Sequence, residues 1–386
     1  MSPTFPYSVM IVPPVALLMS AMAVASPSIE KVTITNSHEI VISGKGFGQG
    51  PQVALYDSFS KAANNNGELT LKPELGEWYS HSNKGALTTG GHGTDSQAIV
   101  ARDSQTSSSV SMVFGIEDEN GVHGLKHFQE VFFSFDLKDE AAYPGSRADG
   151  DNHSLPSSSA TKDAWMMFGH RGDNTSYSVE NMGEPSGHDL YIPAWTGGGF
   201  IIAGNNTPVW PRFNEGTLTH NWAFGDWVTM MFHAKLDPED PYGKAEGFFS
   251  FMNKNTYSMN TREGTLMTDQ SDEGVPYPYW DRIKFNAWAR ASEIPVKRLY
   301  DNIYVAMGDN ANARVVIANA KDLNKATRMV HLLPTSWESG KIKATTPPLD
   351  KNRPQYVHII TSANENSGGK KLCFSCPKPP IKLIAE

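Results

Sequence analysis

Short apolar runs typical of β-strands recur along this chain, and two of them near its start alternate apolar with polar residues in the two-residue period of a strand. Near the start, the runs 27–36 and 38–43 alternate Val, Ile and Thr with polar residues across an Asn-Ser turn, which predicts a hairpin. Further strand-like runs lie at 110–115, 130–137, 164–169, 199–203, 227–234, 247–252 and 282–288. Connections rich in Gly, Ser, Asn and Asp separate them, and helical periodicity is rare. The pattern predicts an all-β protein built from sandwiches.

The two ends of the chain share one pattern. Residues 44–48 read Gly-Lys-Gly-Phe-Gly, which predicts a turn or bulge that larger side chains would obstruct. Near the other end, strand-like runs lie at 313–318, 329–337, 340–345 and 356–361. Their spacing is that of a small sandwich. Both segments resemble the immunoglobulin-like IPT/TIG domain. The resemblance implies one such domain split into residues 26–55 and 306–366, with residues 56–305 inserted between the two parts.

The inserted region contains a series of motifs in an informative order. They are the runs 225–235, 242–253, 284–288 and 300–305, the last of which reads Tyr-Asp-Asn-Ile-Tyr-Val. This order resembles the concanavalin A-like lectin and glucanase jelly roll, a family that includes lectins, glycosidases and polysaccharide lyases. The resemblance implies an all-β fold, a concanavalin A-like jelly-roll sandwich with a smaller immunoglobulin-like β-sandwich domain. Because members of the family differ in activity, the fold does not define the function.

The N-terminal segment predicts export. Residues 11–25 form an apolar stretch that ends in Ala-Val-Ala, the small-residue pattern that a signal peptidase recognises. We therefore expect residues 1–25 to be a signal peptide and the protein to be secreted, periplasmic or on the cell surface. No later stretch reaches the length of about 20 apolar residues that a membrane-spanning helix needs. Membrane insertion is accordingly not expected.

The tail and the overall charge of the chain limit the kinds of molecule that the protein is expected to bind. Residues 367–386 are rich in Pro and Lys and contain the chain's two cysteines, Cys373 and Cys376. In an exported chain this pair favours a disulfide, and a bond to another subunit is the alternative. The formal net charge is -8, with acidic and basic residues interspersed. Such a surface argues against nucleic acid as a partner.

The stretch 165–227 is the richest source of candidate sugar-binding residues. Sugar recognition needs aromatic faces for the apolar side of a pyranose and planar polar groups for its hydroxyls. The predicted substrate-binding residues are Tyr191, Trp195, Trp210, Arg212 and Trp222. Trp165 and Trp227 lie inside apolar runs, so we expect them in the core. The first hypothesis is thus an extracellular or cell-surface polysaccharide-binding protein.

A polysaccharide lyase on the same scaffold is the second hypothesis. Such an enzyme needs a cation or amide beside the substrate carboxylate and a Tyr, His or Lys that moves protons. The candidate catalytic residues are His170, Arg171, His233 and Tyr257. The alginate-lyase signatures Arg-Thr/Ser-Glu and Gln-Ile/Val-His are absent. The acidic strings resemble turns, whereas the paired carboxylates of a retaining glycosidase in such jelly rolls come from one strand.

Two further hypotheses concern metal and assembly. Asp149, Asp151 and Asp173 lie in oxygen-rich loops, as do residues 309–312. Such loops are able to supply ligands for a structural calcium ion, although ordinary turns have the same composition. The third function hypothesis is a structural or adhesive subunit of a surface layer, filament or matrix. It would self-associate through exposed sheet edges or through the cysteine-containing tail.

Overall fold

The protein was analysed as a computed structural model. It describes residues 26–36, 38–65, 68–78, 80–81, 86–92, 97–102, 111–114, 128–141, 160–168, 189–196, 199–204, 226–239, 244–254, 257–265, 280–290, 296–347 and 353–374. Among these residues, every regular element is a β-strand except one short 3-10 turn, η3 (Leu323–Lys325). The predicted all-β class is therefore confirmed. No helix in the described part of the chain is long and apolar enough to cross a membrane.

Strands from both ends of the chain form one seven-stranded sheet. In spatial order it contains β1 (Ser28–Asn36), β2 (Glu39–Lys45), β21 (Lys341–Thr345), β20 (Met329–Glu338), β19 (Arg314–Ala318), β22 (Tyr356–Ile360) and β23 (Lys370–Lys371). The first half of β20 pairs with β19 and its second half pairs with β21. Apolar residues from the two ends of the chain form one buried core, which includes Ile42, Phe47, Val315, Leu332 and Ile359. We call this unit the small sandwich.

The remaining strands form two larger sheets. The eight-stranded sheet runs β16 (Tyr257–Thr265), β15 (Lys244–Met252), β14 (Val228–Leu236), β10 (Glu130–Ala141), β18 (Val296–Met307), β8 (Gln97–Arg102) and β7 (Ala86–Thr89), and β3 (Gln52–Asp57) also pairs with β18. The six-stranded sheet runs β13 (Gly199–Gly204), β12 (Asp189–Thr196), β11 (Ala160–Phe168), β17 (Trp280–Arg290), β9 (Ser111–Phe114) and β6 (Ser80–His81). A separate hairpin joins β4 (Ala63–Asn65) and β5 (Glu68–Thr70). These strands form the large sandwich, and their stacking confirms the predicted sandwich architecture.

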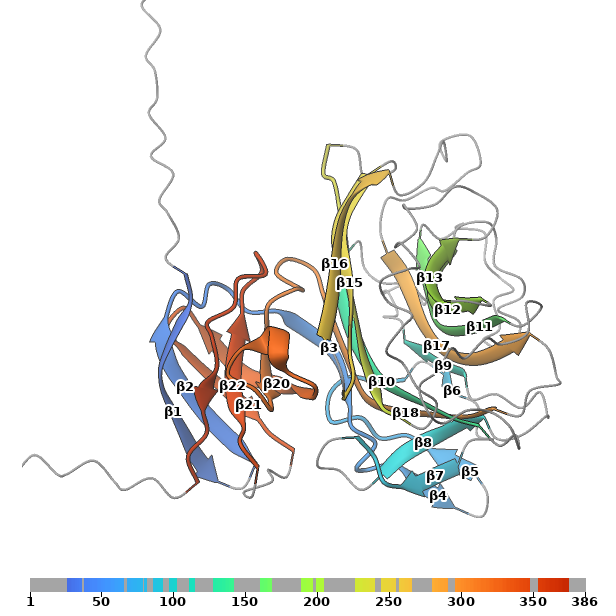
Figure 1. The fold of residues 1–386 in the computed structure, drawn as a ribbon, viewed down its shortest axis with the longest axis horizontal. Helices are drawn as coiled ribbons and strands as arrows, with labels where there is room; N and C mark the ends of the chain where they lie inside the picture. The colour runs from blue at the N-terminus through green and yellow to red at the C-terminus, as the bar shows by residue number, and fades with distance from the viewer. Residues whose placement is uncertain are drawn as a thin grey trace, which may run out of the picture.

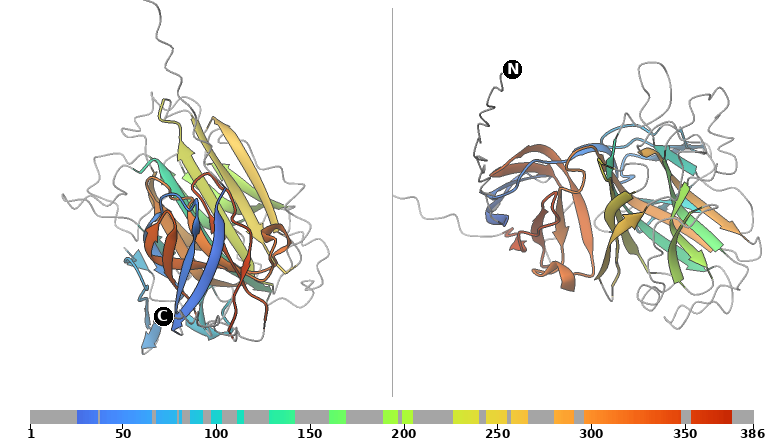
Figure 2. Two further views of the ribbon diagram at one scale, coloured as in Figure 1. Left: turned by 90° about the vertical axis from the view of Figure 1, so that its left-hand side faces the viewer. Right: turned by 90° about the horizontal axis from the view of Figure 1, so that it is seen from above.

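The eight-stranded sheet lies in the middle of the molecule, between the six-stranded sheet and the small sandwich (Figures 1 and 2). On one side, Phe285 of β17 contacts Phe133 and Phe135 of β10 edge-on, with ring centroids 5.9 and 5.5 Å apart. On the other side, Phe132 lies 5.5 Å from the ring of His331 in the small sandwich. Alternate residues of a strand face opposite sides of its sheet. Residues 130–137 of β10 are thus buried on both faces, which explains why five of the seven positions 131–137 are apolar.

The contact between the two sandwiches is itself a hydrophobic core. Its buried members include Tyr56, Phe132, Met231, Phe248 and Tyr304 from the large sandwich, and Val316, Leu323, Met329 and Leu333 from the small one. Arg314 lies within this core, 2% exposed, with its guanidinium 4.8 Å from the centre of the Phe132 ring. Its Nη1 donates to the backbone and side-chain oxygens of Asn312, both at 2.6 Å. The small sandwich therefore covers one face of the middle sheet with a buried, partly charged contact.

Candidate functional site

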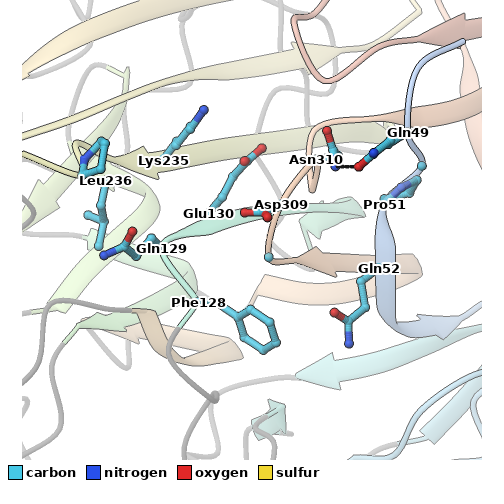
Figure 3. Close-up of a pocket in the computed structure, with 13 residues that line it drawn as sticks. Gln49, Pro51, Gln52, Phe128, Gln129, Glu130, Lys235, Leu236, Asp309 and Asn310 are labelled. Carbon is cyan, nitrogen blue, oxygen red and sulfur yellow. Dashed lines mark hydrogen bonds between the residues drawn. The ribbon is translucent and has the colours of Figure 1, made fainter.

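A cleft lies where the two sandwiches join. Four short segments line it: 49–52, which leads from β2 into β3; 128–130, at the start of β10; 235–238, at the end of β14; and 308–310, which follows β18. Its volume is about 740 Å³. Both chain connections between the sandwiches therefore border the same cavity (Figure 3).

Tight turns hold the lining segments in place. Gly308 has a φ of 73° and Asn310 a φ of 65°, values that favour glycine and asparagine. The backbone N–H of Gly308 donates to the carbonyl of Glu130 at 3.0 Å, which ties the turn to β10. A Cβ atom added to Gly308 would lie 3.1 Å from two carbons of the Phe128 ring. The glycine thus lets this ring pack directly against the turn.

The lining offers amide groups and one aromatic ring. The amides belong to Gln49, Gln52, Gln129 and Asn310, and the ring belongs to the partly buried Phe128. The Asn310 Nδ2 donates to the Gln49 Oε1 at 3.4 Å, which joins the two connections. A primary amide presents donors and acceptors in one plane. The cleft therefore combines an apolar face with groups that match hydroxyls.

Glu130 brings a buried carboxylate to the cleft. The residue is 8% exposed, and its Oε1 accepts a hydrogen bond from the backbone N–H of Asn312 at 3.3 Å. The same oxygen lies 3.1 Å from the Nε2 of His233. Among the described residues, none bonds the second oxygen, Oε2. This carboxylate is fixed on one side and has an acceptor oxygen left for a ligand.

Two more charged side chains line the cleft. Lys235 lies directly opposite Glu130 in the β10–β14 pairing, as Figure 3 shows. Its ammonium is 3.9 Å from the carboxylate of Glu246, and its side chain is 48% exposed. Asp309 is exposed and lies in the turn after β18. The charged groups of the lining are thus two carboxylates and one ammonium, and the ammonium has a carboxylate partner near it.

A second polar cluster lies farther along β10. Asp136 and Asp301 are paired across β10 and β18, and both are buried. Asp136 accepts hydrogen bonds from Thr229 Oγ1 at 2.5 Å and from Asn302 Nδ2 at 2.7 Å, and His92 Nδ1 lies 2.9 Å from it. The backbone N–H of His92 donates to Asp301 at 2.6 Å. These bonds attach the end of segment 86–92 to the sheet, which is a structural role.

Another buried carboxyl group belongs to Asp57 in β3. Its Oδ1 accepts a hydrogen bond from the backbone N–H of Phe59 at 2.8 Å, and its Oδ2 accepts one from Trp78 Nε1 at 2.6 Å. Burial raises the pKa of Asp57 to about 7, although both hydrogen bonds act to lower it. This carboxyl group therefore titrates near neutral pH.

Of the predicted catalytic residues, His233 is the one whose side chain the structure describes. It is 7% exposed and lies behind the cleft, between Glu130 and the ring of Phe248. Tyr257 is the first residue of β16, where it pairs with Met252. His170 and Arg171 lie outside the described residues. Nothing in the described part of the chain therefore brings Tyr257 to His233.

Tyr191 and Trp195, the two predicted sugar-binding residues that the structure describes, are not among the residues that line the cleft. Tyr191 and Trp195 lie in β12 of the six-stranded sheet, opposite Trp165 and Thr161 of β11. The other three, Trp210, Arg212 and Trp222, lie outside the described residues. Trp227, expected in the core, is partly buried and stacks on His92 with ring centroids 5.4 Å apart.

The metal and cysteine predictions fall mostly beyond the described residues. Asp149, Asp151 and Asp173 are outside them, as are Cys376 and the predicted signal peptide. Cys373 is disulfide-bonded. Within the described ranges, no group of three or more His, Cys, Asp or Glu residues is arranged to hold a metal ion. The calcium site remains a prediction.

The sequence did not indicate the cleft because its parts are far apart. Gln49 and Asn310 are separated by 261 positions. The glutamines of the lining lie at or near strand ends, where the apolar–polar alternation of a strand does not mark them. One signal was present: residues 309–312 stood out as an oxygen-rich loop. That loop contributes Asp309 and Asn310 to the lining.

Among known proteins, the chain is similar to several solved structures. No family model matches the chain, and no curated protein matches it. An alginate lyase from Aplysia kurodai is 8% identical, with a TM-score of 0.37, over 57% of this chain and 87% of the lyase. Domain 4 of an extracellular arabinanase from Geobacillus stearothermophilus is 14% identical, with a TM-score of 0.33, over 67% and 94%. Lectin II from Ulex europaeus is 9% identical, with a TM-score of 0.29, over 60% and 96%. At these values the similarities carry no argument about function.

Proposed function

We propose that this protein binds polysaccharide outside the cytoplasm and that the cleft between its sandwiches is the binding site. The observation that carries the proposal is the lining, in which the Phe128 ring lies among the side-chain amides of Gln49, Gln52, Gln129 and Asn310. An aromatic ring stacks on the apolar face of a pyranose. Amide groups exchange hydrogen bonds with its hydroxyls.

The size and construction of the cleft support the proposal. A volume of about 740 Å³ falls within the range of about 300–1,000 Å³ that is usual for small-ligand sites. The lining segments are fixed by strand pairing and by the Gly308–Glu130 hydrogen bond. A site that is already formed loses little conformational entropy when the ligand binds. A short stretch of a glycan chain would fit such a cavity.

The test is a comparison of Phe128→Ala with wild type in isothermal titration calorimetry against neutral, amino and uronic oligosaccharides. We expect the variant to weaken binding by about tenfold or more, because the ring provides the apolar contact. Phe374→Ala is the matched control, since it removes a partly buried ring that packs on the core of the small sandwich. That control should keep the wild-type affinity. Equal affinities of wild type and Phe128→Ala, or no binding of any oligosaccharide, would refute the proposal.

A further inference from the structure

The charge of the cleft points to a class of glycan. Glu130 is the central feature, because the residue is only 8% exposed and one oxygen of its carboxylate is already fixed by Asn312 and His233. The other oxygen has no hydrogen-bond partner among the described residues. A carboxylate oxygen that is open to the cleft and not yet bonded gains most from a donor that carries positive charge.

The neighbouring charges strengthen this preference. Asp309 adds a second carboxylate to the lining. The one cation of the lining, Lys235, is about half exposed and lies 3.9 Å from Glu246, so solvent and a carboxylate both reduce its effect on the cleft. A glycan carboxylate entering the cleft would face two carboxylates at short range and would be repelled.

We propose that the cleft selects glycan units that carry a free amino group, such as glucosamine, and that Glu130 binds the ammonium while uronic acids are excluded. The inference rests on the proposed function, because it assumes that a glycan occupies the cleft. In this arrangement the Glu130 Oε2 accepts from the ammonium, and Asp309 adds to the attraction from the turn after β18. Phe128 and the amides hold the rest of the sugar ring.

The experiment uses three tetrasaccharides of equal length: a glucosamine oligomer, its N-acetylated counterpart and a galacturonate oligomer. Calorimetry is carried out on the full chain at a pH where the amine is protonated. We expect the amino oligomer to bind at least about tenfold more tightly than the acetylated one. We expect no measurable binding of the galacturonate oligomer. Added salt should weaken binding of the amino oligomer.

Two variants locate the selecting group. Glu130→Gln keeps the shape of the side chain and an oxygen for the Asn312 N–H, and it should bring the ratio of amino to acetylated affinity close to one. Asp309→Asn changes an exposed position, so folding is not at issue, and it should reduce the same ratio. Glu338→Gln, an exposed carboxylate on β20 of the small sandwich, is the control that should retain the ratio.

The outcomes separate the two proposals. If the acetylated or galacturonate oligomer binds as tightly as the amino oligomer, the charge selection is wrong and the cleft remains a glycan site. If the ratio survives in Glu130→Gln, Glu130 is not the selecting group. If none of the three oligomers binds, the proposed function itself fails and the inference fails with it.

Discussion

At Asp57, burial and hydrogen bonding act on one carboxyl group in opposite directions. Burial is the larger effect and raises the pKa to about 7 from 3.8, while the N–H groups of Trp78 and Phe59 lower it. Between these two values the folded protein keeps a proton that the unfolded chain has released. The contribution of protonated Asp57 to the stability of the fold is therefore fully present below pH 3.8, and it is lost as the pH rises through about 7.

Asp57→Asn should remove this pH dependence. The asparagine cannot ionise, so the variant should gain stability relative to wild type as the pH rises from 4 to 8. The relative gain should reach roughly 2–4 kcal/mol. The amide loses one acceptor for Trp78, which should make the variant the less stable protein at pH 4. Urea unfolding at several pH values measures both effects, and parallel stability curves for the two proteins would contradict the expectation.

At the scale of elements, the turn after β18 positions the aromatic ring of the cleft. Gly308 adopts a φ of 73° and leaves room for the Phe128 ring. The same turn bonds to β10 through Glu130. The turn thus has two roles: it leads the chain from one sandwich to the other, and it sets the position of the Phe128 ring in the proposed site.

Gly308→Ala should therefore weaken both folding and glycan binding. The added methyl group strains the positive φ at a cost of about 1 kcal/mol, and it displaces the Phe128 ring. We expect oligosaccharide affinity to fall severalfold in calorimetry. Gly368→Ala is the control, because Gly368 has a similar φ of 71° but nothing within 4 Å of an added Cβ. That variant should lose similar stability from strain and keep its affinity.

Whether the sequence predicts a strand depends on the residue pattern of that strand. Buried strands such as β10 and β14 are rich in apolar residues, and the sequence places them within a few residues of their observed bounds. Strand β16, Tyr-Ser-Met-Asn-Thr-Arg-Glu-Gly-Thr, has no apolar run. It lies at one edge of its sheet and pairs with β15 along its whole length, a contact that no local apolar run predicts.

For the whole molecule, the contact between the sandwiches should make them unfold together. Phe132 contacts Tyr304 and Phe248 in the large sandwich and His331 and Arg314 in the small one. A core shared by two units couples their stabilities, because neither unit can lose its side of the contact without exposing the other.

Phe132→Ala should lower the stability of both sandwiches by about 3–5 kcal/mol. Hydrogen exchange followed by mass spectrometry reads peptides of β19 and of β14 separately, and we expect protection to fall in both. Leu75→Ala, at a side chain that is 38% exposed, should change protection little. Loss of protection confined to the large sandwich would show that the two units unfold independently.

The sequence by itself determined the all-β class, the first hairpin and the buried strands, because alternation and apolar runs are local properties that each strand carries. The tertiary structure alone decided that β10 is covered on both faces and that Gln49, Phe128, Glu130 and Asn310 meet in one cleft. These residues come together through strand pairing between distant segments and through packing of one sandwich on the other. No short-range pattern in the sequence encodes this long-range pairing and packing. The candidate site therefore consists of side chains that the sequence pattern did not mark.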